Sequence, residues 1–167
     1  DRKNEYCIVP YSAADIKNPV SEETMLSTNK DLYLYLSGHI DLIDSQSEKS
    51  KLMHRGKEFY ALSKIGAYTF APYIVAARDN SKFCAAVVKP SETDWNETKQ
   101  TICVKHTIII SQKKDGTFIS EDEAYYICGI LNSDIVKSYI ENTFKSNGYS
   151  LNKSNLHLPE YDENNTL

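Results

Sequence analysis

Eight lysine and arginine side chains lie between residues 49 and 90, where they outnumber the acidic side chains eight to two. The flanking segments are acidic: residues 1–48 hold 4 basic and 9 acidic side chains, and residues 91–167 hold 7 and 12. The formal net charge of −4 therefore conceals a basic interval, which we call the basic island. Positive charge at this density indicates a surface that can contact phosphate groups, while the alternative is an ordinary solvated face. The island consists of Lys49, Lys51, Arg55, Lys57, Lys64, Arg78, Lys82 and Lys89.

Two kinds of side chain are needed if the basic island binds duplex DNA. Lysines on loops contact phosphates and fix the register, whereas arginine, asparagine or aspartate can recognise base edges in a groove. Arginine can bridge guanine and asparagine can bridge adenine, each through two hydrogen bonds. An ion-pair role on the surface is the alternative for the two arginines. The phosphate candidates are Lys51, Lys57, Lys64 and Lys82, and the base candidates are Arg55, Arg78, Asp79 and Asn80.

The cysteines and histidines do not form a catalytic or metal-binding pattern. Cys7, Cys84, Cys103 and Cys128 lie far apart, without a C-x-x-C pair or a histidine at ligand spacing, so no zinc or redox motif is predicted. We expect buried, reduced thiols, as in a cytoplasmic protein. His106 and His157 have no catalytic partner in the sequence. We therefore expect no catalytic residue and no metal ligand. The sequence also shows no signal peptide and no apolar run long enough to cross a membrane.

Apolar periodicity and turn residues predict the elements that would hold these side chains in place. An antiparallel hairpin is expected, because two apolar β-branched runs flank the turn sequence Asp79-Asn80-Ser81-Lys82. Leu32, Tyr35, Leu36, Ile40 and Ile43 recur at helical spacing and predict one helix whose apolar stripe packs on the core. The expected strands are 6–9, 73–78, 83–88 and 102–111, the expected helices are 29–44 and 59–65 (closed by Gly66), and a turn is expected at 113–116.

Two further helices are predicted near the C-terminus, meeting at a corner. Ser120 and Glu123 match a capping box, and Ala124, Ile127, Cys128 and Leu131 then form one apolar face. Asn132-Ser133 ends this helix, and Ser133 or Asp134 can cap a second one with Val136, Tyr139, Ile140 and Phe144 inward. A DNA-recognition helix would need basic side chains, but the second helix offers Lys137 and Lys145 against Asp134 and Glu141. We interpret both helices as scaffold.

These elements predict an α+β fold, with a small mixed or antiparallel sheet and helices packed on it. At 167 residues the chain has the length of one domain, expected to span 1–167 with a frayed tail at 162–167. A chain that begins Asp-Arg-Lys is expected to be the C-terminal fragment of a longer protein.

Several motifs, in this order, resemble the target recognition domain of bacterial restriction–modification enzymes with a fused methyltransferase and endonuclease. They are "FYALSKIGAYTFAPYIVAARD", "EAYYICGILNS" and "IVKSYIENTFKSNGYSLNKSNLHLPEYD", which ends in Leu158-Pro159-Glu160-Tyr161-Asp162. Residues 6–11 and 34–40 are also similar to the opening strand and helix of that family, so the resemblance covers most of the chain. One position departs from the pattern, because Ile74 stands where the family has Lys or Arg after the Pro-x pair. The phosphate contact that the family pattern implies there is therefore either missing or moved to another residue, with Arg78 as the candidate.

The resemblance implies sequence-specific recognition of duplex DNA, with the catalytic domain elsewhere in the same polypeptide. The parent would be a site-specific DNA adenine methyltransferase, with or without a fused endonuclease, and would use S-adenosylmethionine and, with an endonuclease, Mg²⁺. This chain itself is expected to bind no cofactor and to have no enzyme activity, since it lacks the Asn-Pro-Pro-Tyr element and the glycine-rich loop of an adenine methyltransferase. A competing hypothesis is a protein–protein docking module of a multi-subunit bacterial enzyme, which the overall acidity and the tyrosines favour.

Overall fold

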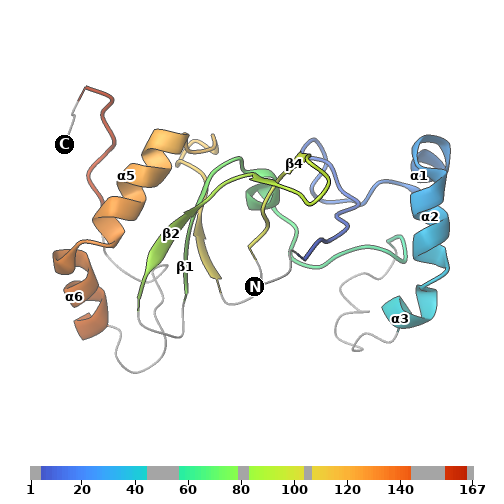
Figure 1. Ribbon diagram of the computed structural model, residues 1–167, viewed down its shortest axis with the longest axis horizontal. Helices are drawn as coiled ribbons and strands as arrows, with labels where there is room; N and C mark the ends of the chain where they lie inside the picture. The colour runs from blue at the N-terminus through green and yellow to red at the C-terminus, as the bar shows by residue number, and fades with distance from the viewer. Residues whose placement is uncertain (1–4, 45–56, 79–82, 104–106, 144–156, 165–167) are drawn as a thin grey trace. The chain divides into compact units, whose positions relative to one another are not determined.

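The computed structural model describes residues 5–44, 57–78, 83–103, 107–143 and 157–164. Helices and a small antiparallel sheet make up these residues, which confirms the predicted α+β class (Figure 1). The backbone forms two compact units, Asp1–Ala67 (unit 1) and Tyr68–Leu167 (unit 2), and each is described by itself. The single recognition domain over residues 1–167 and the frayed tail stay predictions. None of the helices in the described ranges has the length and apolar composition needed to cross a lipid bilayer.

Unit 1 contains three short helices, α1 (Glu22–Thr28), α2 (Lys30–Ser37) and α3 (Ile40–Asp44). The side chain of Asn29 accepts a hydrogen bond from the backbone N–H of Leu32 at 3.3 Å, which confirms its predicted role as an N-cap. Helix α1 was not predicted. The sequence does show an N-cap residue, Ser21, and an acidic first turn. However, the helix buries only one apolar residue, Met25, so the sequence has no apolar stripe that would predict it.

The single helix predicted over residues 29–44 is wrong, because α2 ends at Ser37, with Gly38 as its C-cap, and α3 begins at Ile40. Glycine is a weak helix former, and the Nδ1 of His39 lies 2.8 Å from the carbonyl of Tyr35 at the break. The stripe therefore does not pack as one face: Leu36 is buried with Met25 and Tyr60, whereas Tyr35 and Ile40 are exposed.

Two other predicted elements of unit 1 are also wrong. Residues 6–9 form no strand, because no described segment pairs with them. Residues 59–65 are irregular, and Lys64 has a left-handed backbone (φ 60°) that a helix cannot contain. Hydrogen bonds to distant groups hold this segment instead, from Tyr60 Oη to the carbonyl of Val20 (2.8 Å) and from Leu62 N–H to Tyr11 Oη (3.0 Å). A short 3₁₀ helix, η1 (Ala67–Phe70), follows.

The main sheet of unit 2 has the order β2-β1-β5 and is antiparallel throughout. Its strands are β1 (Ile74–Arg78), β2 (Ala85–Val88) and β5 (Thr107–Ile110). Ile74 pairs with Val88 and Ala77 with Ala85, which confirms the predicted hairpin. The strand predicted over 102–111 is shorter than expected, since Ile102 and Cys103 are not in a strand. A second, unpredicted pair joins β3 (Ser91–Glu92) to β4 (Thr98–Lys99).

Helices α5 (Glu121–Leu131) and α6 (Asp134–Thr143) supply the other half of the core of unit 2 (Figure 1). Ala124 and Leu131 are buried as predicted, with Ile127 and Cys128 packed against the core. Val136 and Ile140 are also buried, but the inward placement of Tyr139 is wrong because its side chain is 41% exposed. Phe144 lies outside the described residues. These helices pack with Val75, Ala77, Phe83, Ala85 and Ile119 of the sheet and its flanks.

The start of α5 has the predicted capping box. Ser120 Oγ accepts from the backbone N–H of Glu123 at 3.2 Å, and Glu123 Oε2 accepts from the backbone N–H of Ser120 at 2.8 Å. Lys113 lies 2.9 Å from the other carboxylate oxygen of Glu123, and its turn at residues 113–116 also forms as predicted. Ser133 Oγ accepts from the backbone N–H of Val136 at 3.4 Å and caps α6.

These contacts make the stability of unit 2 depend on the ionisation of Glu123. Burial, the largest single influence, raises the pKa of Glu123, but the Ser120 backbone N–H and the Lys113 ammonium together bring that pKa below its ordinary value. A carboxyl group with a lowered pKa stabilises the fold above its unfolded pKa of about 4.3, and this contribution is lost as the pH falls through the folded value. We expect Glu123→Gln to lower the free energy of unfolding at neutral pH and to approach the unsubstituted chain in acid. Urea unfolding at both pH values measures this, and a pH-independent difference would contradict it.

Candidate nucleic-acid interface

The structure places three of the eight predicted DNA-contacting residues. Lys57 and Lys64 belong to unit 1, and the backbone of Arg78 ends β1 in unit 2. The other five, Lys51, Arg55, Asp79, Asn80 and Lys82, lie outside the described residues. The placed residues are therefore described within their own units and not as one surface.

The two lysines of unit 1 have different surroundings. Lys57 Nζ donates to the backbone carbonyl of Lys17 at 2.5 Å, which joins two segments 40 residues apart. Lys64 is exposed and has the left-handed backbone already noted. A bulky residue in that conformation is uncommon and costs roughly 1 kcal/mol or more. Lys57 would have to release its carbonyl partner to bind phosphate through the same ammonium hydrogens.

The hairpin of unit 2 defines where the base candidates enter the fold. Because Ala77 pairs with Ala85, residues 78–84 form the connection between two paired strands. Arg78 begins this connection, and it pairs through its backbone with Thr107 on the other neighbouring strand. The four residues 79–82 then follow in sequence. In the sequence, Asp79, Asn80 and Lys82 therefore lie between the two paired strands.

Helix α5 runs along β2 with its acidic first turn at one end of the strand and Asn132 at the other. The side chain of Asn132, after the last turn of α5, bonds to Ala85 at the start of β2. Glu121, in the first turn of α5, pairs with Lys89, just after the end of β2. Helix and strand therefore run in opposite directions, and the acidic first turn (Glu121, Asp122, Glu123) lies at the Val88 end of β2, opposite the Ala85 end. This arrangement keeps these three carboxylates away from the Ala85 end of β2.

One cation of the basic island is already paired at that acidic end. Lys89 Nζ lies 3.2 Å from Glu121 Oε1 and 5.9 Å from the centroid of the Tyr125 ring. The hydrogen bond from Lys89 to Glu121 raises the pKa of Lys89, and its hydrogen bond to Tyr125 adds to this effect. The Tyr73 phenol makes its own hydrogen bond to Glu121, which raises the pKa of Tyr73. These groups are exposed, so the ion pair adds little stability. Lys89 is a poorer candidate for a phosphate contact than its position in the sequence indicates.

Asn132 has a structural role that its sequence context did not reveal. Its Oδ1 accepts from the backbone N–H of Ala85 at 3.1 Å, and its Nδ2 donates to the carbonyl of the same residue at 2.8 Å. Because β2 is an edge strand of the sheet β2-β1-β5, the carboxamide bonds to a strand that has a β-strand neighbour on one side only. The side chain of Asn132, the residue at which α5 ends, therefore links this helix to the sheet. This supports the interpretation of α5 as scaffold.

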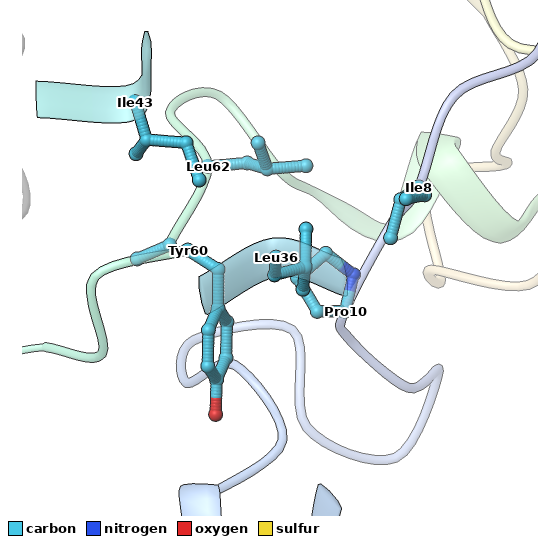
Figure 2. Close-up of a pocket in the computed structure, with 7 residues that line it drawn as sticks. Ile8, Pro10, Leu36, Ile43, Tyr60 and Leu62 are labelled. Atoms are coloured by element: carbon cyan, nitrogen blue, oxygen red, sulfur yellow. The ribbon is translucent and has the colours of Figure 1, made fainter. Parts of the chain in front are cut away.

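Unit 1 contains an apolar pocket of about 140 Å³ (Figure 2). Its lining residues are Ile8, Pro10, Leu36, Ile43, Tyr60, Ala61 and Leu62. Burial raises the pKa of Tyr60 to about 12, so its phenol stays protonated at neutral pH. Its hydroxyl points away from Ile43 and Leu62 and bonds to Val20. The pocket has room for a small apolar group, and no lining side chain is placed for acid–base chemistry at neutral pH.

The cysteines are free, but the prediction that they are buried is wrong for two of them. Cys7 and Cys84 are exposed, whereas Cys103 and Cys128 are half-buried. Cys84 is exposed because extended backbone alternates its side chains, which buries Phe83 and Ala85 on either side. His157 is exposed and His106 lies outside the described residues. Within the described ranges, no group of three or more histidine, cysteine, aspartate or glutamate side chains could hold a metal ion.

A comparison of the chain with protein-family models, curated proteins and solved structures finds no match.

Proposed function

We propose that this chain recognises a short sequence in duplex DNA for a restriction–modification DNA methyltransferase. Catalysis with S-adenosylmethionine, and with Mg²⁺ where an endonuclease is present, belongs to a domain elsewhere in the same polypeptide. The chain positions DNA for that domain and has no reaction of its own. Its compartment under this proposal is the cytoplasm, where cellular DNA is methylated.

The observation that carries the proposal is the register of the β1–β2 hairpin. It pairs Ala77 with Ala85, and the sequence that connects these paired residues contains Arg78, Asp79, Asn80 and Lys82. Arginine and asparagine are the side chains that contact guanine and adenine edges through paired hydrogen bonds. The excess of basic side chains over residues 49–90 and the ordered motifs quoted above support the same function.

Binding of a randomised duplex pool to the 167-residue chain tests the proposal. Released counterions drive phosphate contacts, so we expect affinity to fall steeply as salt rises. Lys64→Ala should weaken binding to all sequences alike and reduce the salt slope by about one. Arg78→Ala should cost about 1–3 kcal/mol at one base position and relax the preference there. Sequencing of the bound fraction at two salt concentrations measures both effects.

Lys30→Ala is the matched control, because Lys30 is exposed but belongs to the acidic segment 1–48. It should leave both the salt slope and the sequence preference unchanged. Affinity that does not respond to salt would contradict the electrostatic basis of the proposal. An unchanged sequence preference for a folded Arg78→Ala variant would remove Arg78 from the base contacts.

Docking of a partner subunit is the second candidate function, and one observation favours it. Leu34 and Tyr35 on α2 are 54% and 56% exposed, and Leu42 on α3 is 69% exposed. Aromatic and aliphatic side chains of this kind are typical of interface cores. Under this alternative, Leu34→Ser would abolish assembly with the subunit that carries the catalytic domain and would leave DNA affinity unchanged.

A further inference from the structure

The thiols of Cys84 and Cys128 converge on one backbone oxygen, although 43 residues separate Ala85 from Cys128 in the sequence. Cys84 Sγ lies 3.8 Å from the carbonyl oxygen of Ala85, and Cys128 Sγ lies 3.5 Å from the same atom. The two sulfurs can therefore be no farther apart than the sum of these distances. They are also close enough to interact electrostatically.

We propose that Cys84 and Cys128 form a reversible disulfide that links the start of β2 to α5 when the protein meets a hydroperoxide. A disulfide holds its two sulfurs about 2.0 Å apart, so one of the two free cysteines has to adjust. Cys84 can do so, because it precedes the first paired residue of β2 and its backbone is not part of the ladder. The inference does not depend on DNA binding.

The two thiols differ in exposure, and this difference indicates which of them reacts first with the peroxide. Cys84 is exposed, so its thiolate attacks the peroxide oxygen; the O–O bond breaks, an alcohol or water leaves, and a sulfenic acid forms. The half-buried Cys128 then attacks the Cys84 sulfur as a thiolate, the S–O bond breaks, and the departing hydroxide takes up a proton as water. Two thiols lose two electrons in total, and the peroxide gains them. In a reducing compartment, excess thiol would reverse the bond.

The surroundings of Cys128 predict how the second step depends on pH. Burial raises the pKa of Cys128, and the Asn132 carboxamide, which donates to its sulfur at 3.4 Å, opposes this effect. The fraction of reactive thiolate therefore grows as the pH rises above neutral. Disulfide closure should become faster over the same range.

Hydrogen peroxide treatment of the full chain, followed by alkylation, digestion and mass spectrometry, tests the inference. We expect two of the four thiols to be lost to alkylation, together with a linked peptide containing Cys84 and Cys128. Its rate of formation should be independent of protein concentration. Cys84→Ser and Cys128→Ser should each abolish the linked peptide, while Cys7→Ser and Cys103→Ser should retain it.

A second measurement tests the order of the two steps through a positive signal rather than through the loss of the linked peptide. In the Cys128→Ser chain, the sulfenic acid at Cys84 should persist and react with a cyclic 1,3-dione, whereas the unsubstituted chain should give little of that adduct. Over-oxidation of Cys84 with Cys128 still reduced would overturn the proposal. Disulfide-linked dimers through Cys7 or Cys84, in place of the internal link, would also overturn it.

Discussion

Replacing Asn132 by alanine is expected to destabilise unit 2 by about 2–4 kcal/mol. The substitution leaves both the N–H and the carbonyl of Ala85 without the carboxamide that now satisfies them at 3.1 and 2.8 Å. An unsatisfied buried donor or acceptor costs about 1–3 kcal/mol, and partial access of water to this half-buried site reduces the total. Urea unfolding followed by circular dichroism, and by the fluorescence of Trp95 in unit 2, measures the change.

Asn132→Asp separates the two hydrogen bonds. A carboxylate can still accept from the Ala85 N–H, but it cannot donate to the Ala85 carbonyl and repels that oxygen. We expect this variant to be at least as unstable as Asn132→Ala at neutral pH and to recover part of the loss in acid, when the carboxyl is protonated. Asn142→Ala is the control, because Asn142 is exposed on α6, and it should change stability by less than about 0.5 kcal/mol. Equal effects at positions 132 and 142 would refute the role of Asn132.

The elements of unit 2 were predictable because their determinants are local in sequence. The capping box needs Ser120 and Glu123 three residues apart, and the hairpin needs two apolar runs around a turn sequence. Unit 1 was harder, since distant contacts determine its irregular segment. Tyr60 and Leu62 bond to groups 40 and 51 residues away, and no local pattern reveals such a partner.

In the candidate site, too, features that are local in sequence could be predicted, whereas contacts between distant residues could not. The sequence alone shows the basic island and predicts that Asp79, Asn80 and Lys82 share a turn that follows the strand ending at Arg78. The pairing of Lys89 with Glu121 could not be predicted, because it requires the antiparallel packing of α5 on β2. The bonds from Asn132 to Ala85 depend on the same packing, as does the approach of Cys128 to Cys84. Sequence therefore supplies candidates for DNA contact, and the packing of α5 on β2 determines that Lys89 is already paired.

The two isoleucines of α6 provide the second large expected effect. Ile140 is 0% exposed and belongs to the core with Val75, Phe83 and Leu131, whereas Ile135 on the same helix is 84% exposed. Ile140→Ala removes buried methyl groups and leaves a cavity, so we expect a loss of about 2–5 kcal/mol. Ile135→Ala should be neutral or slightly stabilising, because alanine is the better helix former.

Both variants replace isoleucine by alanine in α6, so the change in helix propensity is the same in each. The difference between their free energies of unfolding therefore reports the burial of Ile140. Urea unfolding of both chains, with Trp95 fluorescence and circular dichroism as probes, gives the two free energies. If α6 instead used Ile135 to pack on the sheet, as a rotated helix would, Ile135→Ala would be the damaging variant. That outcome would also expose Ile140, and the assignment of α6 as scaffold with its Ile140 face inward would be wrong.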